Sequence, residues 1–129
     1  MTFEFASAGR VTFGPGVIAQ VPAAVAALGA RTVLLVVGRD PTRVQKLRDG
    51  LSAQGLAVTV FPVADEPTVE LARVGVRAAA GADAVIACGG GSALDAGKAI
   101  AALAANGGDP LDYLEVVGAG RALTRPSLP

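Results

Sequence analysis

The chain has no histidine and only one cysteine among its 129 residues. Without imidazole groups or a cluster of thiols, it lacks the side chains that most often hold a transition metal in proteins. The lone Cys88 cannot form a disulfide within the chain, which favours a reducing compartment. Because Cys88 lies in an apolar run, we expect it to be a small residue of the core.

The sequence also lacks an excess of charge of either sign. Lysine plus arginine and aspartate plus glutamate each number 11, so no basic field is available for nucleic acid or an anionic membrane. Charge interrupts the apolar runs, and Met1–Phe5 shows no basic stretch followed by a long apolar one. We therefore expect no nucleic-acid partner, no membrane partner and a cytoplasmic location.

What the sequence does contain is a regular alternation of short apolar runs and stretches with helical periodicity. This alternation is typical of an α/β fold with a parallel sheet, and 129 residues is the size of one domain. After the apolar run at 32–37, Asp40 suits a helix N-cap and Pro41 suits the first helical position. The pattern predicts strands at 11–13, 32–37, 57–61 and 84–88, and helices at about 17–28, 41–54, 69–79, 92–105 and 109–116.

The most informative segment is Gly89-Gly90-Gly91-Ser92-Ala93-Leu94-Asp95-Ala96-Gly97-Lys98, directly after the last predicted strand. Three glycines and a serine between a strand and a helix leave backbone N–H groups free at the helix N-terminus, where an anion is stabilised. The expected ligand is a phosphate or pyrophosphate. The spacing from Gly91 to Gly97 is one residue too long for a P-loop, and Leu94 stands where G-x-G-x-x-G needs glycine.

Residues 87–101 resemble the G-G-G-S-x-x-D-x-x-K signature of the iron-containing (group III) alcohol dehydrogenase family. Residues 10–16 are similar to the opening strand and turn of that family, and Pro67-Thr68 to its Pro-Thr before the third helix. Residues 109–113 resemble the stretch after its motif helix. The resemblance extends from about Phe5 to Pro126, which is nearly the whole chain.

The resemblance implies that residues 1–129 form the amino-terminal dinucleotide-binding domain of that family. The implied fold is a Rossmann-like parallel sheet with flanking helices, as in the dehydroquinate synthase-like amino-terminal domain. The implied parent protein is an NAD(P)-dependent oxidoreductase that interconverts an alcohol and a carbonyl compound, with Fe²⁺ or another divalent metal. Because members of the family are dimers or larger, the resemblance also implies a homo-oligomer.

Family roles can be carried over to individual residues of the glycine motif. Gly90, Gly91 and Ser92 would bind the pyrophosphate, with Gly89 in the same loop. Asp95 would lie close to the nicotinamide ribose, and Lys98 matches the lysine of the signature. The alternative is that Asp95 only favours the first helical turn and Lys98 is a solvated cation.

The chain departs from the family in two respects. The family holds its metal with one aspartate and three histidines in its later half, and this chain has no histidine. The family also continues into a further strand after the residues that match 125–129 here. We therefore expect no metal-binding helical domain in this chain, a sheet that stops before its last strands, and no catalysis by the chain alone. The alternative function is a stand-alone nucleotide-binding module without chemistry of its own.

The choice between NAD and NADP depends on the residues after the second predicted strand. Many family members present an acidic residue to the adenosine ribose there, whereas this chain has Gly38-Arg39-Asp40. Gly38 leaves room for a 2′-phosphate and the Arg39 guanidinium can pair with it, so we favour NADP. If Asp40 binds the ribose instead, the cofactor is NAD. The remaining carboxylates are expected to be solvated or to cap helices: Asp65, Glu66, Asp109, Asp112 and Glu115.

Overall fold

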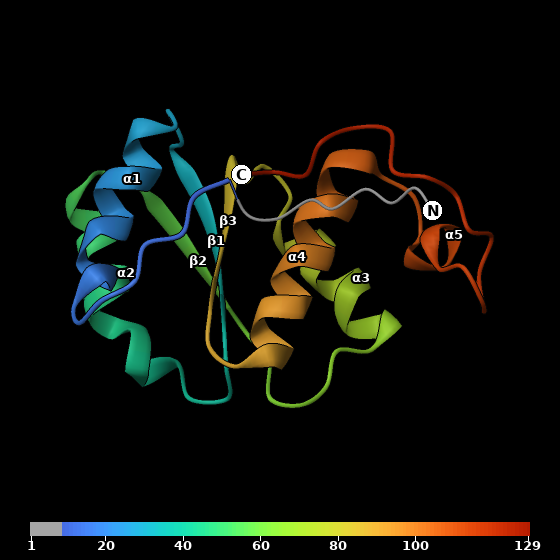
Figure 1. Cartoon of the computed structure of the whole chain (residues 1–129), viewed down its shortest axis with the longest axis horizontal. Coiled ribbons are helices and arrows are strands. Elements are labelled where there is room, and N and C mark those ends of the chain that lie inside the picture. Colours follow the sequence, from blue (N-terminus) through green and yellow to red (C-terminus); the bar gives the residue numbers. More distant parts are fainter. Residues whose placement is uncertain (1–8) are drawn as a thin grey trace, which may run out of the picture.

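The structure is a computed structural model that describes residues 9–129, so the features predicted for Met1–Phe5 lie outside it. Helices surround a parallel sheet on both of its faces, as the sequence predicts (Figure 1). In chain order the elements are η1 (Val17–Gln20), α1 (Val21–Ala27), β1 (Thr32–Val37), η2 (Pro41–Val44), α2 (Gln45–Ala53), β2 (Ala57–Pro62), α3 (Val69–Ala78), β3 (Ala84–Cys88), α4 (Gly91–Asn106) and α5 (Pro110–Tyr113).

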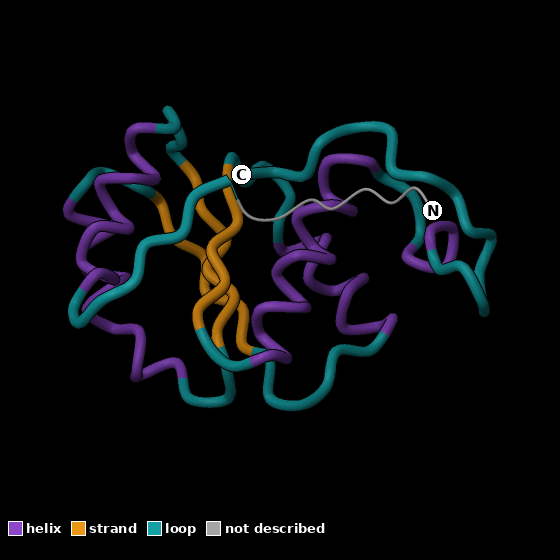
Figure 2. Tube along the Cα trace, viewed as in Figure 1, coloured by secondary structure: helices purple, strands orange, loops and turns teal. Residues whose placement is uncertain are grey.

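Strand β1 is the centre of the fold. The strand order is β2-β1-β3, and Val33 of β1 lies opposite Val58 of β2 and Ala84 of β3. All five residues from Val33 to Val37 are fully buried, because helices cover both faces of the sheet. Figure 2 shows helices on both sides of the strands. Alternate side chains of β1 therefore enter two separate cores, one against α1 and α2 and the other against α3 and α4.

Side chains cap the starts of three helices. Asp40 caps η2 by accepting from the backbone N–H of Thr42, and Pro41 follows at the first helical position. Thr68 caps α3 through its hydroxyl, which accepts from the N–H of Leu71. Asp109 and Asp112 form a reciprocal capping box at α5, as their predicted capping role requires.

The strand predicted at residues 11–13 is wrong. Val11 is 80% exposed and Phe13 99% exposed, and among the described residues no strand partner pairs with this segment. A strand exists only where its backbone hydrogen-bonds to a neighbour, and this segment pairs with neither outer edge of the β2-β1-β3 sheet. The helix predicted over 17–28 is also shorter and less regular, because its first turn is 3-10 and Leu28 is exposed.

The last segment of the chain runs without regular structure over α4 to the outer edge of β3 (Figure 1). The side chain of Asn106 holds this segment by accepting from the backbone N–H groups of Thr124 and Arg125. At its end, the carbonyl of Pro129 accepts from the N–H of Val85 at 2.9 Å. Within residues 9–129, no helix has the length and apolar character that crossing a membrane requires.

The carboxylate of Asp83 joins the starts of two neighbouring strands. Its Oδ2 accepts from the backbone N–H groups of Arg31 at 2.8 Å and Thr32 at 2.9 Å. These two bonds hold the pKa of Asp83 below its usual value. A lowered pKa in the folded state means that this stabilisation is present above the unfolded value of about 3.9 and is lost as the pH falls through the folded pKa.

Substitution of this carboxylate should therefore have a pH-dependent effect on stability. We expect Asp83→Asn to lower the free energy of unfolding at pH 7, and the difference from the unsubstituted chain to shrink as the pH falls below about 4. Urea unfolding at several pH values measures this difference. Asp49→Asn on the exposed face of α2 is the control, and a loss that stays constant down to pH 2 would exclude the carboxylate as its cause.

Candidate functional site

The candidate site is a crevice at the carboxyl ends of β1 and β3. After β1 the chain turns to α2 on one face of the sheet, and after β3 it turns to α4 on the other face (Figure 1). The loops that follow two adjacent strands are thereby drawn apart. In an open parallel α/β sheet, this is the position where ligands bind.

Two neighbouring cavities fill this crevice. The larger, of about 440 Å³, is lined by Gly38, Arg39, Asp40, Arg43, Val44, Cys88, Gly89 and Gly90. The smaller, of about 170 Å³, is lined by Gly38, Arg39, Val63, Ala64, Gly90, Gly91, Ser92 and Ala93. Seven of the nine residues predicted to bind a cofactor therefore lie around one crevice.

The three glycines of the loop differ in what they contact. A β-carbon on Gly89 would lie 2.9 Å from the β-carbon of Ala93 and 3.2 Å from the backbone nitrogen of Gly38, so this glycine lets the two loops pack together. A β-carbon on Gly90 or Gly91 would meet no protein atom within 4 Å. The space in front of these two residues is open for a ligand to approach the backbone.

The helix that follows the loop offers donors for an anion. Gly90 is the N-cap of α4, and no side chain caps that terminus. The 16 residues of α4 give it a full macrodipole, and its first-turn N–H groups point towards the loop. Backbone donors, a helix dipole and two open glycines fit a phosphate or pyrophosphate group.

Arginines line the other side of the crevice. Nε and Nη2 of Arg39 both donate to the carbonyl of Ala64, and Nη2 also pairs with Oδ1 of Asp65 at 2.7 Å. Arg43 lines the larger cavity with Arg39, and the sequence-based prediction missed it. Its position three residues after the N-cap Asp40 places it on the same turn, which is the signal that would have found it.

Asp40 is occupied by its own turn. Its carboxylate accepts from the hydroxyl and the backbone N–H of Thr42, and these bonds hold the pKa of Asp40 below its usual value. The carboxylate therefore stays ionised while it caps η2. Cys88, expected to be a core residue, is only partly buried and lines the larger cavity.

Asp95 and Lys98 lie outside this crevice. They pair with each other at 3.5 Å across one turn of α4, and both side chains are mostly exposed. Lys98 lines a different cavity, beside the segment that contains Leu128. The structure therefore places these two residues on the surface of α4 and does not bring them to the other seven.

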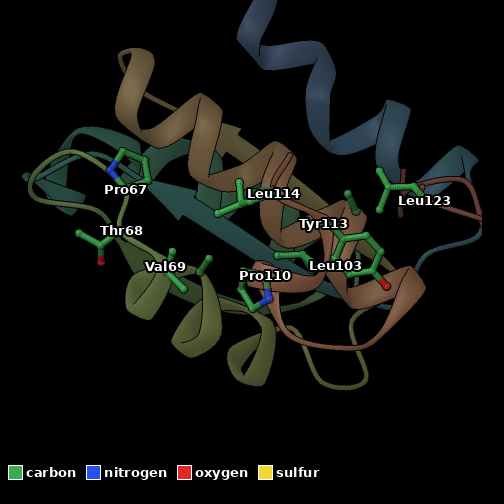
Figure 3. Close-up of a pocket in the computed structure, with 11 residues that line it drawn as sticks. Pro67, Thr68, Val69, Leu103, Pro110, Tyr113, Leu114 and Leu123 are labelled. Atoms are coloured by element: carbon green, nitrogen blue, oxygen red, sulfur yellow. The ribbon is translucent and has the colours of Figure 1, made fainter. Parts of the chain in front are cut away.

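A separate apolar cavity of about 340 Å³ lies between α3, α4 and α5 (Figure 3). Val69, Leu103, Pro110 and Leu114 line it, and the Tyr113 hydroxyl nearby donates to the carbonyl of Gly107. No charged side chain lines this cavity. Without a charged side chain, and with the Tyr113 hydroxyl engaged by Gly107, this cavity does not suit a phosphate.

Among residues 9–129, no group of three or more histidine, cysteine, aspartate or glutamate side chains comes together as a metal site. With no histidine in the sequence and one cysteine, the residues of this chain do not fit a catalytic metal.

A parallel sheet with a glycine-rich loop between a strand and a helix at its carboxyl edge defines a Rossmann-like α/β domain. Residues 8–129 match the family described as iron-containing alcohol dehydrogenase. The chain belongs to this family, as its glycine motif predicts.

Several relatives are similar to this chain. Long-chain-alcohol dehydrogenase 1 from Geobacillus thermodenitrificans (strain NG80-2) is 34% identical over 137 residues, which cover 95% of this chain and 34% of that protein. The structure of a 1,3-propanediol oxidoreductase is 28% identical with a TM-score of 0.87, covering 100% of this chain and 34% of its own. Sulfoacetaldehyde reductase from Bifidobacterium kashiwanohense, solved with NAD⁺, is 27% identical with a TM-score of 0.84, covering 100% and 35%. The chain spans about a third of the length of each.

Proposed function

We propose that this chain is the cofactor-binding part of a metal-dependent, NAD(P)-linked alcohol dehydrogenase and that it binds NADP in preference to NAD. The observation that carries the proposal is the open glycine loop at the N-terminus of α4, opposite Arg39 and Arg43. This arrangement offers backbone donors for a pyrophosphate and guanidinium groups for a further phosphate. The similarity to a reductase solved with NAD⁺ supports a dinucleotide as the ligand.

Each residue of the crevice has a proposed role. The backbone at Gly90 and Gly91 and the hydroxyl of Ser92 bind the pyrophosphate, while Gly89 keeps the two loops in contact. Arg39 pairs with the 2′-phosphate of the adenosine ribose, next to Gly38. Asp40 orients the turn that carries Arg39 through its cap on η2.

When bound, a nicotinamide dinucleotide supplies the hydride donor or acceptor for interconversion of an alcohol and a carbonyl compound. The role of this chain is to bind and orient that dinucleotide. Asp95 and Lys98 lie on α4 outside the crevice. We propose that they contact the cofactor only if its nicotinamide end extends along that helix. The substrate and the divalent metal are proposed to bind residues that this chain does not contain.

The preference for NADP is tested by Arg39→Ala. A charge-assisted hydrogen bond to a phosphate contributes about 1.5–3 kcal/mol, so we expect NADPH to bind about tenfold more weakly to the variant. NADH has no 2′-phosphate, and its affinity should change less than about twofold by the same reasoning. Fluorescence titration of the full chain with each coenzyme measures both constants.

Arg48→Ala, which removes an exposed arginine of α2 outside the crevice, is the matched control. It should leave both affinities unchanged. Equal losses for NADPH and NADH in Arg39→Ala would reject the assignment of the 2′-phosphate to Arg39. Failure of the unsubstituted chain to bind either coenzyme would reject the proposed function.

A further inference from the structure

The loop between β2 and α3 brings two carboxylates to the proposed cofactor crevice. Asp65 pairs with the guanidinium of Arg39 at 2.7 Å, and Oε1 of Glu66 accepts from the hydroxyl of Ser92 at 3.3 Å. Arg39 and Ser92 are the two side chains that are proposed to bind phosphates of the cofactor. Each of them is therefore already in contact with a carboxylate of the protein.

We propose that Asp65 is a specificity-determining residue that lowers the affinity for a 2′-phosphate by competing with it for Arg39. The inference rests on the proposed function. A 2′-phosphate that binds Arg39 must displace the carboxylate of Asp65 from Nη2. A cofactor without that phosphate does not meet this competition.

The geometry distinguishes competition from positioning. Arg39 is oriented by the carbonyl of Ala64, which accepts from both Nε and Nη2. The backbone of this loop is held independently of Asp65, because the neighbouring Val63 is 2% exposed and its N–H donates to the carbonyl of Val37 at 2.8 Å. Arg39 therefore stays in place when the carboxylate of Asp65 is removed.

The ion pair itself is weak enough to be displaced. The side chains of Arg39 and Asp65 are 75% and 81% exposed, and solvent screens a pair of this kind strongly. Asp65 thus sets the affinity for the 2′-phosphate without preventing its binding. The preference for NADP is reduced by this carboxylate but kept.

Glu66 provides a control within the same loop, because its carboxylate competes with the pyrophosphate and not with the 2′-phosphate. Its contact is with Ser92, which is proposed to bind the pyrophosphate that NADPH and NADH share. Removing its charge should raise the affinities for both coenzymes by the same factor. Asp65→Asn and Glu66→Gln each remove one negative charge from adjacent positions of one loop.

The test is fluorescence titration of the full chain and its variants with NADPH and NADH. We expect Asp65→Asn to strengthen NADPH binding about fivefold and NADH binding less than twofold, in line with the energy of a screened surface pair. Glu66→Gln should leave the ratio of the two affinities unchanged. In the double variant Arg39→Ala/Asp65→Asn the gain for NADPH should be absent, since both changes act on one pair.

Three results would overturn the inference. Weaker NADPH binding to Asp65→Asn would show that Asp65 positions Arg39. The same gain without Arg39 would show a general effect of charge. If Glu66→Gln changed the ratio of the NADPH and NADH affinities as much as Asp65→Asn does, the effect would not be specific to the carboxylate beside Arg39. In all three cases both coenzymes still bind, so the proposed function survives, whereas binding of neither coenzyme overturns both.

Discussion

Replacing Gly90 by valine is expected to abolish dinucleotide binding while the chain stays folded. The backbone of Gly90 has φ −78° and ψ −170°, which any residue adopts, and a β-carbon there would meet no protein atom within 4 Å. The valine side chain would instead occupy the space in front of α4 from which a phosphate reaches the backbone. Loss of two charge-assisted hydrogen bonds weakens binding at least about 100-fold.

The cost to the fold is expected to be small. Valine is a poorer N-cap than glycine, which lowers the free energy of unfolding by about 1 kcal/mol. Circular dichroism and urea unfolding measure this, and titration with NADPH and NADH measures binding. Gly9→Val is the control, because its β-carbon also meets open space but lies outside the crevice. Retained binding by Gly90→Val would move the phosphate site away from this loop.

The sequence predicts the central part of the fold because local and tertiary preferences agree there. Val33–Val37 is a short, continuous apolar run rich in valine, which is typical of a strand buried on both faces, and β1 is that strand. The Asp40-Pro41 pair likewise defines a helix start without any distant contact. The segment 11–13 also consists of residues that favour a strand, but whether it pairs depends on distant parts of the sheet, which its own residues do not specify.

The site is predictable to the extent that it is made of backbone. Glycines between a strand and a helix indicate a phosphate loop because they let a ligand approach the backbone. The strand order then places that loop beside the end of β1. The contacts of Asp65 and Glu66 were not predictable in this way. Each joins residues 26 positions apart, and an acidic loop residue is usually solvated.

The pair Arg73 and Asp109 illustrates the same limit. Asp109 is predicted as a cap and does cap α5, but its carboxylate also takes two hydrogen bonds from Arg73 of α3, at 2.6 and 2.9 Å. These bonds hold the pKa of Asp109 below its usual value. The local role follows from spacing along the chain, whereas the link between α3 and α5 follows from how the helices pack.

Gly97 is the residue of the motif whose replacement should damage the fold most. A β-carbon at this position would lie 2.6 Å from the β-carbon and 3.6 Å from the α-carbon of Ala87 in β3. Gly97 therefore allows α4 to lie directly against the strand, and the contacting atoms belong to a rigid strand that cannot move aside. Gly97→Val overpacks this interface, and we expect it to lower the free energy of unfolding by about 3 kcal/mol.

The same substitution should also disturb the candidate site, because α4 carries the glycine loop at its N-terminus. Lys98→Val, one position further along, is the matched control: it places the same β-branched residue in the same helix on an exposed surface. Its expected cost is about 0.5–1 kcal/mol, from helix propensity and the loss of the exposed pair with Asp95. Urea unfolding of the two variants separates the cost of overpacking against β3 from the cost of a β-branched residue in the helix. Equal losses would mean that the close approach of α4 to β3 does not set the stability of the domain, and the glycine at position 97 would then need a reason outside packing.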